Sequence, residues 1–122
     1  RLPKYNPERR KTYSISAWKF VCEQAAEAFR EQGLTNIVEW IEGMAATRPR
    51  KSDQDGLDAC LCLLVGMHLA AGGEGLMVGD HQTCYIVVPY EQKLREELDS
   101  RCCEIPCDPS VAPRAFRLID AS

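Results

Sequence analysis

The sequence predicts an α/β fold on two observations. Apolar residues recur at helical spacings of three and four through much of the first 71 positions, whereas residues 75–88 form two short β-branched runs around a turn. The chain has 122 residues, of which 45% are apolar, so we expect one hydrophobic core and a single domain over residues 1–122. The expected elements are helices near residues 16–32, 37–45, 53–71 and 90–100 and a β-hairpin at 75–88.

Two helices are expected after a basic, proline-broken arm at residues 1–13 that should not be helical. Ser14 or Ser16 is placed to cap the first helix, and Gly33 is placed to end it. The apolar face of this helix carries Trp18, Val21, Ala25 and Phe29. Asn36 is expected to cap the second helix, which apolar side chains nearly surround.

The third helix is the most informative element. Three carboxylates crowd its first turns, and beyond Asp58 it is apolar on every side up to Gly72-Gly73. A helix of this kind packs between other elements, so we expect it to be buried, with His68 as a hydrogen-bonded core residue rather than a metal ligand. A hairpin turn at residues 79–82 and a charged surface helix should follow.

The charge distribution favours anion binding at one end of the chain. Fifteen basic and 18 acidic residues give a net charge of −3, which excludes a uniformly basic nucleic-acid coat and a polycationic membrane peptide. Residues 1–52 nevertheless carry +4 and residues 53–122 carry −7. The basic residues placed to contact nucleic-acid phosphates are Lys4, Arg9, Arg10, Lys11, Arg50 and Lys51. An ordinary solvated basic face is the alternative.

The chain is not expected to enter a membrane. The longest strongly apolar stretch, residues 59–71, is far shorter than the ~20 residues that cross a bilayer. The seven cysteines of the chain are odd in number and irregularly spaced, which favours reduced thiols and a cytoplasmic location. The cluster Cys102, Cys103 and Cys107 lacks the second ligand pair of a structural zinc site.

A pair of carboxylates at the start of the third helix is the candidate site. Asp55 and Asp58 are three residues apart, so both lie on one helix face, where they would hold Mg²⁺ or Mn²⁺. The alternative is structural: Asp53 is the N-cap, and the helix dipole favours Asp55. Capping does not account for Asp58, which directly precedes the apolar run.

Several short segments resemble a bacterial family of predicted RNase H-like nucleases of uncharacterised function. The resemblance covers the opening PKYNP at residues 3–7 with Arg10, Lys11 and Trp18, then KSDQDGLDA at 51–59, VGD at 78–80 and YIVVP at 85–89. The Asp-x-x-Asp-Ala element is also similar to the last acidic motif of the Holliday-junction resolvase branch of the RNase H-like superfamily.

The resemblance implies the C-terminal portion of an RNase H-like fold and metal-dependent phosphodiester hydrolysis. Asp55 and Asp58 would be catalytic metal ligands, and Asp53 would cap the helix or support them. The family's first catalytic Asp lies on a first strand that this chain lacks, so the carboxylate site is expected to be incomplete. We therefore expect a fragment completed by a preceding segment or by a second copy. The alternative is a non-catalytic RNase H-like binding or assembly module.

Overall fold

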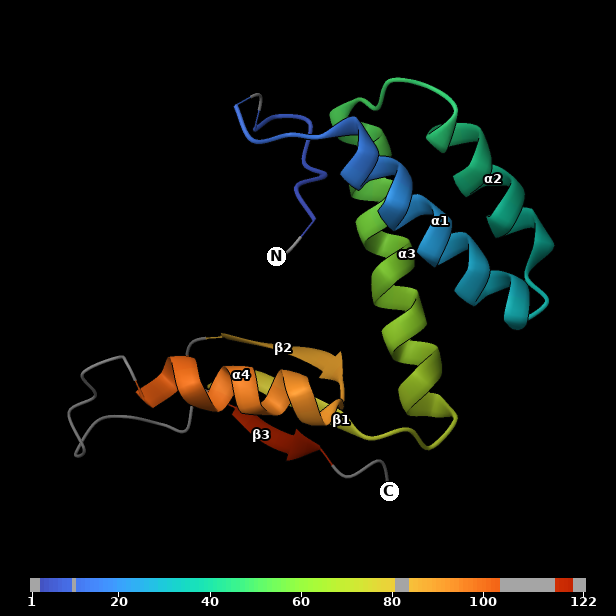
Figure 1. Cartoon of the computed structure of the whole chain (residues 1–122). Helices are drawn as coiled ribbons and strands as arrows, with labels where there is room; N and C mark the ends of the chain where they lie inside the picture. Colours follow the sequence, from blue (N-terminus) through green and yellow to red (C-terminus); the bar gives the residue numbers. More distant parts are fainter. Residues whose placement is uncertain (1–2, 10, 81–83, 104–115, 120–122) are drawn as a thin grey trace. The chain divides into compact units, whose positions relative to one another are not determined.

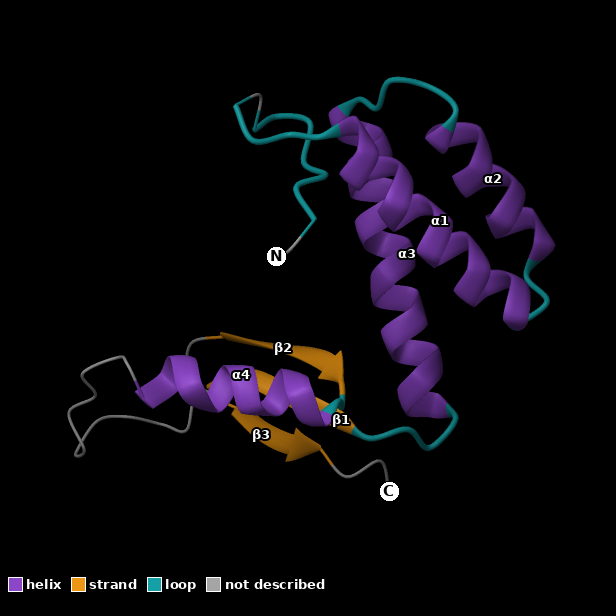
Figure 2. Ribbon diagram, in the orientation of Figure 1, coloured by secondary structure: helices purple, strands orange, loops and turns teal. Residues whose placement is uncertain are grey.

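The computed structural model describes residues 3–9, 11–80, 84–103 and 116–119. It is a mixed α/β chain with four helices and a small antiparallel sheet (Figures 1 and 2). The expected helices and hairpin are all present, with ends within a few residues of those predicted. The elements are α1 Ile15–Glu31, α2 Thr35–Ala45, α3 Lys51–Ala70, β1 Gly75–Asp80, β2 Cys84–Pro89, α4 Gln92–Cys103 and β3 Phe116–Ile119.

Backbone contacts divide the chain into two compact units, Arg1–Leu64 and Val65–Ser122. The division falls inside α3, whose first turns belong to the N-terminal unit. Each unit is described below by itself. The single domain expected over residues 1–122 stays a prediction.

Local hydrogen bonds fix both ends of α1. Ser14 is the N-cap, because its hydroxyl oxygen accepts the backbone N–H of Ala17 at 3.3 Å. At the other end Gly33 adopts a φ of 73°. Its backbone N–H donates to the carbonyl of Arg30, and the N–H of Leu34 donates to the carbonyl of Phe29. This is a Schellman motif, and its left-handed residue favours glycine, so the predicted helix end at Gly33 is confirmed.

The start of α2 differs from the prediction. The helix begins at Thr35, Leu34 is the N-cap residue, and no side chain caps it. The Leu34 carbonyl accepts the N–H of Val38 at 3.2 Å directly after the turn at Gly33. Asn36 therefore lies inside the first turn, and its predicted capping role is wrong.

The start of α3 also lies earlier than expected. The helix begins at Lys51, so Asp53 is its third residue rather than its N-cap. The Asp53 Oδ2 atom accepts the backbone N–H of Arg50 at 2.7 Å, which is the returning half of a capping box. Asp53 thus caps the helix as predicted, but from inside the first turn.

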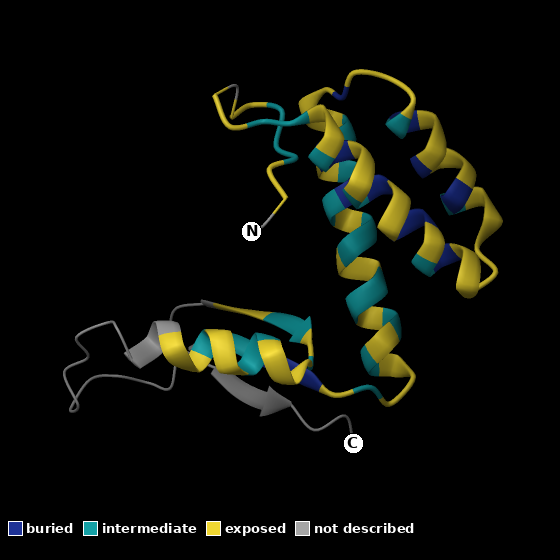
Figure 3. Ribbon diagram, in the orientation of Figure 1, coloured by how far each residue is buried: buried dark blue, intermediate teal, exposed yellow. Residues whose placement is uncertain are grey.

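The N-terminal unit contains most of the described core (Figure 3). Its fully buried side chains come from all three helices: Trp18, Cys22 and Phe29 from α1, Ile41 from α2, and Leu57 from α3. Only Gln54 and Leu57 are buried along α3, while Cys62 and Leu63 are exposed. The expectation that α3 is buried on every side is therefore wrong, because only one face of the helix, which carries Gln54 and Leu57, reaches the core. We refer to these two residues as the buried stripe of α3.

In the C-terminal unit, β1 is the central strand of a sheet with the order β2-β1-β3. Leu76 is fully buried on β1 and pairs with Val88 of β2 and Leu118 of β3 in antiparallel register. The hairpin was expected from its β-branched runs, whereas β3 was not, since residues 104–122 show no clear period. The predicted turn extends into residues 81–83, which lie outside the described residues.

His68 lies at the end of α3 rather than in a core. It is exposed, and its Nε2 atom lies 2.8 Å from the carbonyl oxygen of Glu74. A Cβ atom on Gly73 would collide with the imidazole ring, so the backbone can lie this close to His68 because residue 73 is glycine. The predicted hydrogen-bonded state is present, but the predicted core position is wrong.

Replacing Gly56 by Ala is expected to be less favourable than replacing Gly43 by Ala. Both glycines lie inside helices, where alanine is favoured by roughly 0.5–1 kcal/mol. A Cβ on Gly56 would lie 2.6 Å from Cη2 of Trp40, whereas a Cβ on Gly43 meets nothing within 4 Å. Urea unfolding should show that Gly43→Ala raises the free energy of unfolding. The free energy of unfolding of Gly56→Ala should be about 1 kcal/mol below that of Gly43→Ala. Equal effects would mean that the indole moves aside without cost.

Candidate functional site

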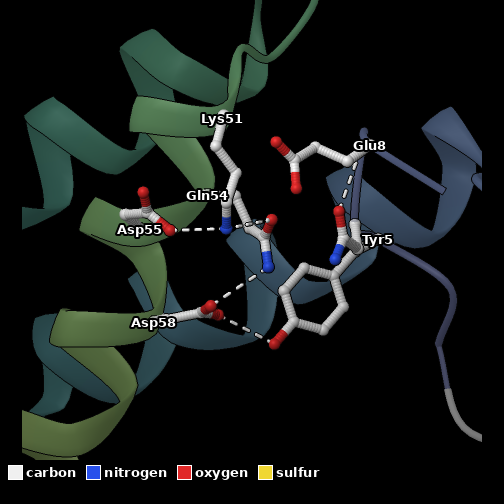
Figure 4. Close-up of polar contacts among 7 residues, drawn as sticks. Tyr5, Glu8, Lys51, Gln54, Asp55 and Asp58 are labelled. Carbon is white, nitrogen blue, oxygen red and sulfur yellow. Dashed lines mark hydrogen bonds and ion pairs between the residues drawn. The ribbon is translucent and has the colours of Figure 1, made fainter.

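The candidate site lies where the N-terminal arm meets the first turns of α3 (Figure 4). The Tyr5 hydroxyl donates to Oδ1 of Asp58 at 2.9 Å, across 53 residues of sequence. The Gln54 side-chain amide donates to Oδ2 of the same carboxylate at 3.1 Å. Both oxygens of Asp58 therefore have donors from the protein, and the arm is attached to the helix through them.

A second set of contacts extends this network along α3. The Lys51 ammonium donates to Oδ1 of Asp55 at 2.6 Å and to Oε1 of Gln54 at 3.1 Å. Gln54 is the one buried polar residue of the described chain, and both ends of its amide are hydrogen-bonded. A buried amide that is satisfied at both ends is held in one orientation. We refer to Tyr5, Lys51, Gln54, Asp55 and Asp58 as the α3 network.

The arm itself is a folded loop. The backbone N–H of Ser14 donates to the carbonyl of Lys4 at 2.9 Å, which closes the loop at its base. Within it, the Arg9 N–H donates to the Asn6 carbonyl, and the Asn6 side chain accepts the N–H of Glu8. The arm is non-helical, as predicted, and these bonds define its path.

A pocket of about 360 Å³ lies between the arm and α3. The polar residues that line it are Lys4, Asn6, Arg9, Thr12 and Gln54, and we call it the arm pocket. Lys4 and Arg9 form no ion pair with any described residue, whereas Gln54 belongs to the α3 network. The pocket is therefore basic and rich in hydrogen-bonding groups.

The structure places the other predicted phosphate contacts differently. Lys51 is bound to Asp55, and the Nε atom of Arg50 lies 3.5 Å from the Asp53 carboxylate. Lys11 is exposed on the arm. Arg10 lies outside the described residues.

The two predicted metal ligands fit a cation only in part. Asp55 and Asp58 lie on one helix, as predicted, but Lys51 is bound to the first and Tyr5 and Gln54 to the second. Within the described ranges, no group of three or more His, Cys, Asp or Glu side chains is arranged to hold a metal ion. Mg²⁺ is commonly held by one or two carboxylates together with substrate phosphate and water. These residues thus offer two carboxylates, and both already accept hydrogen bonds from the protein.

Burial and hydrogen bonds raise the pKa values of two groups of the α3 network and of one core thiol. Desolvation, followed by the hydrogen bond to Asp58, raises the pKa of Tyr5 to about 12. The hydrogen bond to Asp55 is the main cause of a raised pKa at Lys51, so the ammonium is kept charged. Burial raises the pKa of the Cys22 thiol in the core to about 11.

The three cysteines whose side chains are described are free thiols: Cys22, Cys60 and Cys62. Of these, Cys22 is buried and Cys62 is exposed. The side chains of Cys102, Cys103 and Cys107 lie outside the described part of the chain. In that described part, no helix has the length and hydropathy of a bilayer-spanning segment.

Sequence reasoning missed Gln54 and the contact that Tyr5 makes. Gln54 lies three residues before Leu57, on the stripe of α3 that is buried, and this spacing is the signal that would have indicated it. The hydroxyl of Tyr5 in the arm bonds Asp58. That contact accounts for the carboxylate that capping did not explain.

Comparison with known proteins adds no relative. The chain matches no protein-family model, no curated protein and no solved structure.

Replacing Tyr5 by Phe is expected to lower the free energy of unfolding by about 1 kcal/mol, because Asp58 loses a donor. The loss should depend on pH. The pKa of Tyr5 is raised from 10.0 to about 12 in the folded chain, so its contribution is fully present below pH 10 and disappears as the pH rises toward 12.

Unfolding of the wild-type chain and of the Tyr5→Phe variant across this range provides the measurement. Tyr90→Phe is the matched control, because the Tyr90 hydroxyl donates to a nearby residue, Gln92, two positions away. A difference between wild type and Tyr5→Phe that stays constant from pH 10 to 12 would contradict the assignment.

Proposed function

We propose that the N-terminal unit binds the phosphate backbone of a nucleic acid at the arm pocket. One observation carries this proposal: Lys4 and Arg9 line a hollow of about 360 Å³ without a carboxylate partner among the described residues. Cationic side chains attract phosphates, and neutral hydrogen-bonding groups orient them. Asn6, Thr12 and Gln54 supply such groups around the two cations.

The position of the pocket supports the same proposal. The Tyr5–Asp58 hydrogen bond and the Ser14–Lys4 backbone bond hold the arm at Lys4 and Tyr5 and, beyond Arg9, at Ser14. A binding loop that is already folded loses less conformational entropy when its ligand arrives. This function corresponds to the binding module that the sequence leaves open as the alternative to an enzyme.

A second candidate function is metal-dependent phosphodiester hydrolysis in an RNase H-like fold. One observation favours it: Asp55 and Asp58 lie on the helix that also provides Gln54 to the arm pocket. In this proposal the two aspartates hold Mg²⁺ or Mn²⁺, Asp53 keeps the helix start in place, and bound phosphate completes the metal's ligands. The metal would activate water and stabilise the leaving oxygen.

Replacing Lys4 and Arg9 together by Gln is expected to weaken nucleic-acid binding and its dependence on salt. Each lost phosphate contact should reduce the slope of log K against log salt by roughly 0.7–0.9. The control is the pair Lys19→Gln and Lys93→Gln, which removes the same charge from exposed helix positions. Fluorescence anisotropy at several salt concentrations gives the slopes. A slope that falls equally in both double variants would assign binding to net charge rather than to the arm pocket.

The metal proposal is tested by Mn²⁺ calorimetry in the presence of an oligonucleotide. Replacing Asp55 and Asp58 by Asn should abolish Mn²⁺ binding, because both carboxylate ligands are lost. Tyr5→Phe is the matched control: it breaks the same contact to Asp58 but retains both carboxylates, so it should bind Mn²⁺ at least as tightly as wild type. If wild type binds no Mn²⁺, or if the Asn variant binds as wild type does, the two aspartates are not metal ligands.

A further inference from the structure

A second hollow of the N-terminal unit lies between α2 and the start of α3. It has a volume of about 530 Å³, within the usual range of small-molecule sites. Trp40 of α2 and the arginines Arg48 and Arg50 of the following loop line it. We call it the Trp40 groove, and it shares no lining residue with the arm pocket.

The indole of Trp40 is accessible and held in place. The residue is 45% exposed, although Val38, Ile41 and Met44 of the same helix are buried. The edge of its six-membered ring lies against the backbone of α3 at Gly56, where a Cβ would be 2.6 Å from Cη2 and 2.9 Å from Cζ2. The absence of a side chain at Gly56 thus creates the space that the ring edge occupies.

Cationic groups accompany the indole. Arg48 is exposed and forms no ion pair with a described residue. The Arg50 side chain is 82% exposed, and its ion pair with Asp53 involves Nε at 3.5 Å. Two carboxylates, Glu39 and Asp53, also line the groove, and Asp53 already accepts the Arg50 N–H. The groove therefore combines an aromatic surface with two guanidinium groups and two carboxylates, one of which, Asp53, is already bound to Arg50.

We propose that the Trp40 groove binds one nucleotide of a single-stranded nucleic acid. The base stacks on the indole, and the adjoining phosphate contacts Arg48 and Arg50. An unpaired base has a free π-face, whereas a base inside a duplex is already stacked on both sides, so this chemistry selects single strands. The proposal rests on the nucleic-acid binding proposed above and adds the strand state of the ligand.

The test compares a short oligothymidylate with an abasic deoxyribose-phosphate strand of the same length. Both strands offer phosphates, but only the first offers bases. The wild-type chain is expected to bind oligothymidylate roughly tenfold more tightly than the abasic strand, since stacking one base on an aromatic ring commonly has an effect of this size. Trp40→Ala should bind both strands equally, and circular dichroism verifies that this variant remains helical.

Tryptophan fluorescence gives a second readout. The chain has two tryptophans, and Trp18 is fully buried while Trp40 is exposed. Oligothymidylate should quench wild-type emission, and the quenching should be lost in Trp40→Phe, which leaves only the buried indole. The phenyl ring of this variant should retain part of the preference for the base-bearing strand, which a purely structural role of Trp40 would not produce.

The two proposals fail in different ways. If wild type binds both strands equally and Lys4→Gln with Arg9→Gln still reduces the salt slope, the arm pocket binds phosphate and the Trp40 groove does not bind bases. If Trp40→Ala keeps the full preference for oligothymidylate, base stacking occurs elsewhere and the groove proposal is wrong. If wild type binds neither strand at any salt concentration, both proposals are wrong.

Discussion

The two hydrogen bonds that Asp58 accepts hold the candidate site together. The half-buried carboxylate of Asp58 directly follows the buried Leu57 on α3, so it needs donors, and it receives them from Tyr5 and Gln54. The first contact joins the arm to α3, and the second orients the only buried polar side chain in the described chain. The positions of Lys4 and Arg9 around the arm pocket depend on this attachment, because both lie within four residues of Tyr5 in sequence.

The same carboxylate is needed by both proposed functions, but in different states. As an acceptor for Tyr5, Asp58 holds the arm in a form that suits phosphate binding. As a metal ligand, it would use the same oxygens that accept from Tyr5 and Gln54, and Asp55 would use the carboxylate that accepts from Lys51. A bound phosphate would favour the metal by adding ligands while also contacting the arm's cations.

Much of the secondary structure was predictable because its signals are local. Ser14 at the start of α1 and Gly33 at its end are recognisable in sequence, since each acts through bonds to residues within a few positions. The hairpin follows from two β-branched runs around a turn. The predicted cap at Asn36 fails for a related reason: the turn at Gly33 brings Leu34 into the cap position, and this decides the helix start before Asn36 is reached. The strand β3 has no local signal, and it exists through its pairing with β1.

What the sequence determined by itself is the set of helices, the hairpin, the basic arm and the pair of aspartates on one helix face. These follow from periodicity, caps and composition, which act over a few residues. Only the tertiary structure decided what each side chain meets: Tyr5 reaches Asp58 across 53 residues, and Trp40 lies against Gly56 of another helix. Such pairings depend on how helices pack, and packing depends on all the side chains of the core at once. The apolar turns of α3 show the same limit, since their hydrophobicity is visible in the sequence but their exposure is set by which stripe the neighbouring helices cover.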